Sequence, residues 1–265
     1  GPLSHRCQPE KRRAPMATTG CGFAPSSARC FWGIMMLNPW ISALSFALLL
    51  GGCAPASAEL SHDATSRRSF ANVEHWVRVF DDPERDAWQK PHELIEALEI
   101  QPASRVADLG AGTGYLLGHL SRAVGEDGVV LAIDTEPALV EHLRDRADKE
   151  GLSNATPILA SADNPRIPAK SVDLILILDT YHHIDDRVAY ARDLQAKLRP
   201  GGRVVIIDWR KRDLPVGPPR DHKLARSHVI AEMAEAGFTL ESEPEILPHQ
   251  YFLNFRPSDG DRKKR

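Results

Sequence analysis

Cysteine is missing from most of this chain, and its absence excludes several kinds of site. All four cysteines of the 265 residues lie at or before Cys53. A disulfide framework, a cysteine zinc site and a cysteine nucleophile are therefore excluded from everything that follows. The overall composition, with 42% hydrophobic and 26% charged residues, is that of an ordinary globular protein.

An excess of positive charge is also lacking beyond Cys53. The first 53 residues hold five Lys and Arg against one acidic residue, and the remainder holds 28 basic and 35 acidic residues. Because a nucleic-acid-binding surface is normally basic, we expect no nucleic-acid partner. The basic tail within residues 259–265 is expected to be solvated and disordered.

Residues 1–60 are predicted to lie outside the folded body, as a disordered or signal segment. Gly1–Ser4 resembles the remnant of a protease cleavage site. The uncharged run Trp40–Leu50 is too short for a transmembrane helix but has the length of a signal-peptide apolar region. Leu50–Cys53 resembles a bacterial lipobox, which predicts a membrane tether through Cys53 and a membrane-anchored or periplasmic protein. If the upstream residues reflect a wrongly assigned start, the protein is instead cytoplasmic.

The remaining residues alternate between helical and strand patterns. Two helical stretches, 70–80 and 84–98, form an N-terminal extension within residues 61–104. Apolar strand patterns follow at 105–109, 128–133, 156–160, 172–178, 203–208, 239–243 and 250–255, mostly with helical patterns between them. Such alternation demands a parallel sheet with helices on both faces. The sequence predicts an α/β protein with a Rossmann-like, doubly wound, mostly parallel seven-stranded sheet in one domain, 105–258, behind two N-terminal helices.

A glycine-rich turn follows the first predicted strand, in the sequence Val-Ala-Asp-Leu-Gly-Ala-Gly-Thr-Gly-Tyr of residues 106–115. Glycines there let a ligand lie against the backbone, next to the unpaired N–H groups of the following helix. A dinucleotide-binding turn would need its third glycine at position 115, which is Tyr115. The spacing therefore disfavours an NAD-dependent oxidoreductase. Asp108, two residues before Gly110, suits a cationic ligand group better than a pyrophosphate.

The turn resembles that of class I S-adenosylmethionine-dependent methyltransferases, and the resemblance covers residues 85–255. Further matches are Ile133-Asp134 at the end of the second strand, the 162–168 segment Ala-Asp-Asn-Pro-Arg-Ile-Pro, the 171–175 segment Ser-Val-Asp-Leu-Ile, and the 198–203 segment Leu-Arg-Pro-Gly-Gly-Arg. Ala162 replaces a glycine that is usual in the family. The chain looks most similar to the ubiquinone/menaquinone-type and type 11 small methyltransferases.

The resemblance implies a role for individual residues. Asp108, Gly110, Ala111 and Gly112 would hold the methionine end of S-adenosylmethionine, Asp134 its ribose and Asp163 its adenine. Asp179, which ends the fourth strand, would face the methionine moiety or the acceptor.

Substrate-side candidates follow that strand, where ligands bind in open α/β sheets. His182 or His183 could act as a base near neutral pH, or the pair could cap and pack the next helix. Adjacent residues point in different directions, so no metal site is expected. Tyr181 is a further substrate-side candidate, and Trp88, Gln89 and His222 are candidates for a lid, although Trp88 would fit a core position equally well.

The sequence thus predicts methyl transfer from S-adenosylmethionine to a small-molecule acceptor by in-line displacement. Such a reaction needs alignment and desolvation rather than a metal or a triad. The alternative is a membrane-tethered protein that binds S-adenosylmethionine or another nucleotide without turnover, because a lipobox predicts export whereas S-adenosylmethionine is made in the cytoplasm. The acceptor and the oligomeric state are left open.

Overall fold

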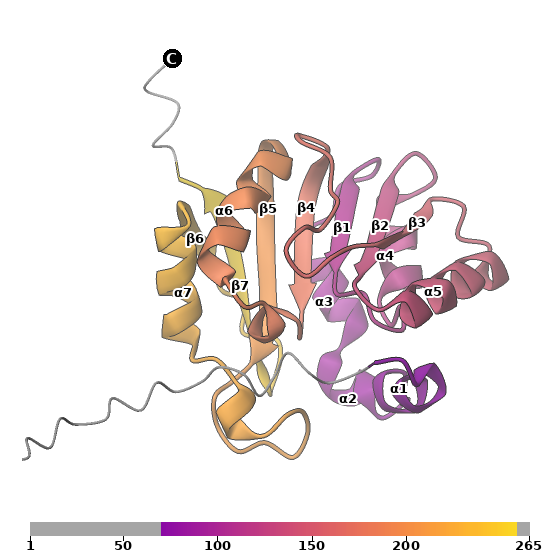
Figure 1. Ribbon diagram of the computed structural model, residues 1–265, viewed down its shortest axis with the longest axis horizontal. Helices are drawn as coiled ribbons and strands as arrows, with labels where there is room; N and C mark the ends of the chain where they lie inside the picture. The colour runs from indigo at the N-terminus through magenta and orange to yellow at the C-terminus, as the bar shows by residue number, and fades with distance from the viewer. Residues whose placement is uncertain (1–69, 259–265) are drawn as a thin grey trace, which may run out of the picture. The chain divides into compact units, whose positions relative to one another are not determined.

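A seven-stranded sheet organises the computed structural model, in which residues 70–258 are described (Figure 1). The strand order is β3-β2-β1-β4-β5-β7-β6. Strands β1 to β5 run parallel to one another, and β7 runs antiparallel to both β5 and β6. The strands are β1 (Arg105–Leu109), β2 (Val129–Asp134), β3 (Ala155–Leu159), β4 (Val172–Leu178), β5 (Leu198–Trp209), β6 (Phe238–Ser242) and β7 (Gln250–Pro257). The predicted α/β class and mostly parallel seven-stranded sheet are confirmed.

Seven α-helices and two 3-10 turns connect these strands within the described residues. They are α1 (Val73–Phe80), α2 (Arg85–Gln89), α3 (Pro91–Ala97), α4 (Leu117–Val124), α5 (Pro137–Glu150), η1 (Tyr181–His183), α6 (Arg187–Lys197), η2 (Arg220–His222) and α7 (Arg226–Glu235). Helices α1 and α2 lie beyond the ends of the strands rather than on a face of the sheet (Figure 1). They therefore stand over the edge where ligands bind in open α/β sheets.

Two separate cores lie on the two faces of the sheet. Along β4, for example, Leu174 and Leu176 face one core whereas Ile175 and Ile177 face the other, as the alternation of side chains along a strand requires. Helices α3, α4 and α5 contribute to the first core, and α6 and α7 to the second. Because both faces are covered, the central strands are nearly continuous apolar runs.

Two expectations about helix ends were wrong. The helix expected at 84–98 is two short helices, α2 and α3, separated at Lys90, whose φ is 48°. Pro91 lacks an N–H group and restricts the residue before it, so a continuous helix cannot pass this point. The N-terminal extension consequently has three short helices rather than two. The helix before β5 was expected to run to Pro200, yet α6 ends at Lys197 and β5 begins at Leu198.

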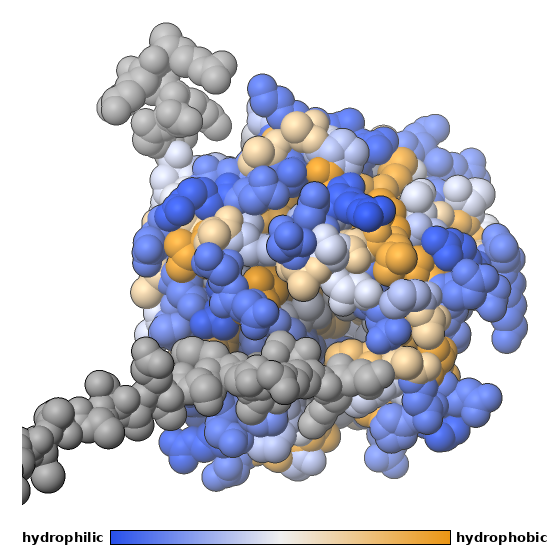
Figure 2. Space-filling model, viewed as in Figure 1, coloured by the Kyte–Doolittle hydropathy of each residue, from blue (hydrophilic) through white to orange (hydrophobic). Residues whose placement is uncertain are grey.

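The surface shown in Figure 2 mixes hydrophilic and hydrophobic residues. Among residues 70–258, the large hydrophobic side chains that remain exposed are Val79 and Leu159. No helix in this range has both the length and the apolar character needed to cross a membrane. The predicted signal segment, the Cys53 tether and the basic tail all lie outside the described residues and stay predictions.

Candidate active site

Four aspartates end strands or directly follow them at one edge of the sheet. Asp108 lies on β1, Asp134 ends β2, Asp179 follows β4 and Asp208 lies near the end of β5. The parallel register sets these carboxyl ends side by side, with Asp108 opposite Ala132 on β2 and Leu176 on β4. The fold thus gathers carboxylates that are up to 100 residues apart in the sequence.

The glycine turn after β1 brings two parts of this edge into close contact. Gly110 has a φ of 78°, and a Cβ atom at this position would lie 2.2 Å from Oγ1 of Thr180, which follows β4. A side chain at position 110 would therefore strain the backbone and would collide with Thr180 in the turn after β4. The turn is fixed from the other side by N–H groups of Gly110 and Ala111, which both donate to the carbonyl of Ile133.

Asp134 connects the glycine turn to the end of β2. Its Oδ2 accepts a 2.9 Å hydrogen bond from the N–H of Gly112, and its Oδ1 accepts one of 3.0 Å from the N–H of Glu136. Burial raises the pKa of Asp134, and these backbone donors oppose the rise. Each carboxylate oxygen has two lone pairs, so each retains acceptor capacity for a hydroxyl donor.

Asp108 and Asp179 are unusually costly carboxylates to keep ionised. Burial raises the pKa of Asp108 to about 7; the Asp134 carboxylate adds to the rise, and Arg85 opposes it. Burial likewise raises the pKa of Asp179 to about 7, against the opposing charge of Arg85. Asp179 also has a φ of 52°, a strained conformation for a residue with a side chain and one that is concentrated at functional sites.

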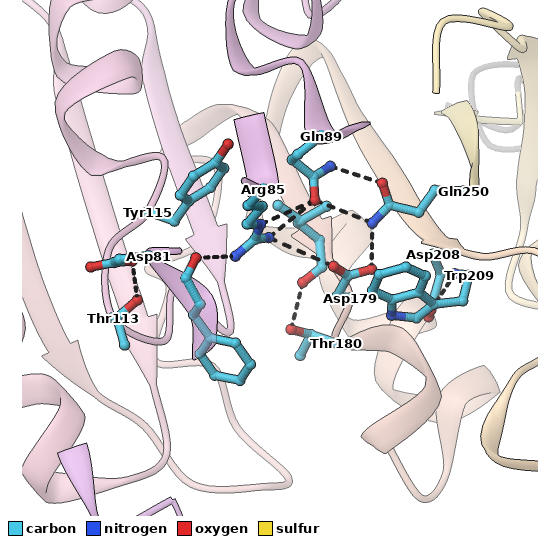
Figure 3. Close-up of polar contacts among 12 residues, drawn as sticks. Asp81, Arg85, Gln89, Thr113, Tyr115, Asp179, Thr180, Asp208, Trp209 and Gln250 are labelled. Carbon is cyan, nitrogen blue, oxygen red and sulfur yellow. Dashed lines mark hydrogen bonds and ion pairs between the residues drawn. The ribbon is translucent and has the colours of Figure 1, made fainter. Parts of the chain in front are cut away.

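Arg85 of α2 is the cation that enters this group, as Figure 3 shows. Its Nη2 lies 3.7 Å from Oδ2 of Asp179, and its guanidinium carbon lies 4.0 Å from the centre of the Tyr115 ring. Its Nη1 donates to the carbonyl of Phe80 at 2.8 Å. The side chain is 9% exposed, and burial lowers its pKa. A single, largely buried guanidinium therefore offsets two strand-end carboxylates.

Two glutamines extend the same network towards β7 (Figure 3). Gln89 Nε2 donates to Gln250 Oε1 at 2.8 Å, and Gln250 Nε2 donates to Asp179 Oδ1 at 2.7 Å. Both glutamines are almost fully buried. Gln89, a lid candidate from the sequence, is therefore part of an interior network. Its neighbour Trp88 packs against Trp209, with the ring centres 5.4 Å apart.

A histidine and an aspartate form a second polar pair beside this network. His182 Nδ1 lies 2.9 Å and 3.0 Å from the two carboxylate oxygens of Asp208, and the His182 N–H donates to Oδ2 of Asp208 at 3.2 Å. Burial by itself would lower the pKa of His182, but the charge and hydrogen bond of Asp208 raise it above its usual value. His183 is half-buried and contacts His182 with ring centres 4.1 Å apart and the ring planes tilted by 41°.

The other candidates from the sequence are more widely placed. Tyr181 is 1% exposed and belongs to the core beneath α6 and α7. His222 lies on η2 and lines a cavity together with His182. Asp163 is exposed after β3 and accepts a hydrogen bond from Ser161 Oγ at 2.7 Å.

Sequence reasoning missed three residues of the site: Arg85, Asp208 and Gln250. Asp208 had a usable signal, because it ends an apolar strand as Asp108 and Asp134 do. Arg85 and Gln250 had none, since their partners lie 94 and 71 residues away and are defined only by the fold.

Residues 106–202 match the family model described as a methyltransferase domain. This range includes the glycine turn, Asp134, Asp163, Asp179 and both adjacent histidines. In the structure, these residues form part of the seven-stranded fold. Solved S-adenosylmethionine-dependent methyltransferases have the same fold. One from Aquifex aeolicus is 24% identical, with a TM-score of 0.67, and the match covers 71% of this chain and 98% of that one.

Curated relatives with sequence similarity are also methyltransferases. The ubiquinone/menaquinone biosynthesis C-methyltransferase UbiE of Vibrio vulnificus strain YJ016 is 30% identical over 144 residues, which are 53% of this chain and 54% of that protein. The aklanonic acid methyltransferase DauC of Streptomyces sp. strain C5 is 28% identical over 160 residues, covering 60% of this chain and 70% of that protein. The chain spans about half the length of its UbiE relatives.

Proposed function

We propose that this chain binds S-adenosylmethionine at the carboxyl edge of β1, β2 and β4 and transfers its methyl group to a small molecule. The observation that carries the proposal is the pair of strand-end carboxylates, buried Asp108 and partly buried Asp179, beside the glycine-rich turn. Such carboxylates favour a cationic ligand, because a cation lowers the cost of keeping them ionised. S-adenosylmethionine carries positive charge on both its sulfonium and its amino group.

The residues present fit the different parts of this cofactor. Asp108 and the glycine turn would hold the amino acid end, Asp134 has acceptor capacity left for ribose hydroxyls, and exposed Asp163 would take the adenine. When bound, S-adenosylmethionine supplies a methyl group attached to a good leaving group. The chain's own contribution is to align an acceptor with that methyl group and to exclude water.

Helix α2 is proposed to act as a lid over this edge. Arg85 and Gln89 reach from α2 into the carboxylate network, and Trp88 packs on Trp209 at the end of β5. A cationic ligand beside Asp179 would take over part of the charge compensation that Arg85 provides. Cofactor binding would therefore weaken one of the contacts that hold α2 in place.

A small acceptor is favoured by the relatives and by the short connections of the fold. The relatives UbiE and DauC are a ubiquinone/menaquinone biosynthesis C-methyltransferase and an aklanonic acid methyltransferase. Fold alone does not determine the reaction, however, since the [4+2]-cyclase SpnF has this fold with a TM-score of 0.53. Turnover therefore has to be tested directly.

The test is transfer of labelled methyl from S-adenosylmethionine into a bacterial small-molecule extract by the full chain. We expect labelled products that are absent when Asp108→Asn replaces the wild type. Cofactor binding without any labelled product, in extracts from several growth conditions, would instead support the alternative of a binding protein without turnover.

A further inference from the structure

The His182–Asp208 pair lies outside the carboxylate network that the proposed cofactor would occupy. Asp208 is fully buried and His182 is 7% exposed. Both oxygens of Asp208 lie within 3.0 Å of His182 Nδ1, and Oδ1 accepts a further hydrogen bond from the N–H of Trp209 at 2.7 Å. The carboxylate is thus held in place by the backbone of η1 and β5 while it binds the ring.

The same imidazole lines a cavity of about 110 Å³ between η1 and η2. Its walls carry both signs of charge and include Ile184, Asp185, Arg187, Lys211, Asp221, His222, Lys223 and Leu224. Lys223 is 2% exposed and its Nζ donates to the carbonyl of Arg212 at 3.0 Å, so it forms part of a built wall. This cavity therefore adjoins His182, whose side chain is 4% exposed.

We propose that His182 is the general base of this enzyme, that Asp208 is its positioning residue, and that the acceptor in the adjoining cavity is a small molecule that loses a proton on methylation. Phenols, enols and acidic carbon centres are acceptors of this class. The inference rests on the proposed methyl transfer and specifies which acceptors that reaction takes.

The chemistry follows from which ring nitrogen is already used. Asp208 binds Nδ1, so a neutral His182 carries its proton there and presents Nε2 as the acceptor. Nε2 takes the proton of the acceptor's O–H or C–H bond, and the freed electron pair forms the new bond to the methyl carbon. The bond from that carbon to sulfur breaks, and its electron pair stays on sulfur. The imidazolium that results is stabilised by the Asp208 carboxylate.

Several charged groups besides Asp208 influence this proton. Asp179 at the end of β4 favours the imidazolium, whereas Arg187 on α6 opposes it. The His183 ring contacts that of His182, and the cavity adds Asp185, Lys211, Asp221, His222 and Lys223. Because the net effect raises the pKa of His182, the rate of transfer should rise with pH through that pKa and then level off.

The first test needs no knowledge of the acceptor. In the full chain labelled with ¹⁵N-histidine, we expect His182 to be neutral at high pH with its proton on Nδ1. Asp208→Asn should lower the pKa of His182 and reduce the Nδ1–H form. Asp173→Asn removes a strand carboxylate at the opposite edge of the sheet and should change neither. A proton on Nε2 in the wild type, or an unchanged His182 pKa in Asp208→Asn, would overturn the proposal.

The second test uses S-adenosylmethionine carrying a ¹³C-methyl group and the same small-molecule extract. The carbon shift of the product identifies the acceptor atom, and we expect oxygen or carbon. Asp208→Asn should reduce kcat on the order of 100-fold and move the pH profile to lower pH, while leaving S-adenosylhomocysteine binding intact. Methyl groups found only on atoms that carry no proton to lose, such as a tertiary amine nitrogen or a thioether sulfur, would overturn the proposal. Failure of the wild type to bind S-adenosylhomocysteine would instead contradict the proposed function itself.

Discussion

The two halves of the carboxyl edge are built in different ways. Around β1 and β2, the polar groups come from one short stretch, and backbone N–H groups hold them, as in the bond from Gly112 to Asp134. Around β4 and β7, side chains hold one another, as in the chain of contacts from Gln89 through Gln250 to Asp179. The first half has the features of a site for a constant ligand, and the second those of a site that can change with the acceptor.

The difference predicts how each half should respond to mutation. A backbone-built turn tolerates no side chain, whereas a side-chain network can lose one member at moderate cost and change its pH dependence. The following predictions test this contrast, from the largest expected effect to the smallest.

The contact between the two halves should be the most sensitive point. Gly110→Ala adds strain at a φ of 78° and a collision with Thr180, so we expect a loss of about 4 kcal/mol in the free energy of unfolding. Gly151→Ala is the matched control, because Gly151 has a left-handed helical conformation with a φ of 68° and open space around it; about 1 kcal/mol is expected. Urea unfolding measures both. Equal losses would refute the role of the close contact, and Thr180→Ala should partly rescue Gly110→Ala.

Asp108→Asn should weaken ligand binding and, at pH 8, stabilise the fold. We expect the affinity for S-adenosylhomocysteine to fall roughly 100-fold, because a buried charge partner is lost. Since the pKa of Asp108 is about 7 in the fold and 3.8 in its absence, ionising this group destabilises the fold increasingly as pH rises from about 4 to 7. The variant should therefore be more stable than the wild type at pH 8, by on the order of 2 kcal/mol, and equally stable at pH 4. A variant that is less stable at pH 8 would contradict this account.

Arg85→Met tests the cation that joins α2 to the second half. At pH 8, where Asp179 is ionised, we expect a loss of about 2 kcal/mol in unfolding free energy. At pH 5 the carboxylate is protonated, because its pKa is about 7, so the loss should be smaller. The control Arg144→Met removes an exposed pair with Glu141 and should cost little at either pH. A loss for Arg85→Met that is independent of pH would show that packing, not charge, gives Arg85 its importance.

Binding of the cofactor product should depend on pH in a direction fixed by these carboxylates. The ammonium group of S-adenosylhomocysteine binds best when Asp108 is ionised, so affinity for this ligand should be constant above pH 7 and fall about tenfold per pH unit below it. Calorimetry between pH 5 and 8 measures this slope. In Asp108→Asn the slope should become shallower, and an unchanged slope would assign the pH dependence to another group.

The contrast between the two halves of the carboxyl edge also explains which site residues the sequence could predict. Asp108, Gly110 and Asp134 belong to local patterns of strand, turn and strand, and their positions follow from them. Gln250 begins β7, which runs antiparallel and pairs it with Trp209, so its presence at this edge depends on strand direction. Arg85 lies 94 residues before its partner Asp179, so no local pattern pointed to this pair, whereas Pro91 could have revealed the helix break at Lys90. Long-range side-chain partners remained beyond sequence reasoning.

The most direct measurement is isothermal titration of the full chain with S-adenosylhomocysteine at pH 8, alongside Asp108→Asn. The account predicts saturable binding at one site per chain, and a far weaker response from the variant. A folded wild-type protein that releases no heat and shows no thermal stabilisation with this ligand would contradict the claim that the strand-end carboxylates form a cofactor site.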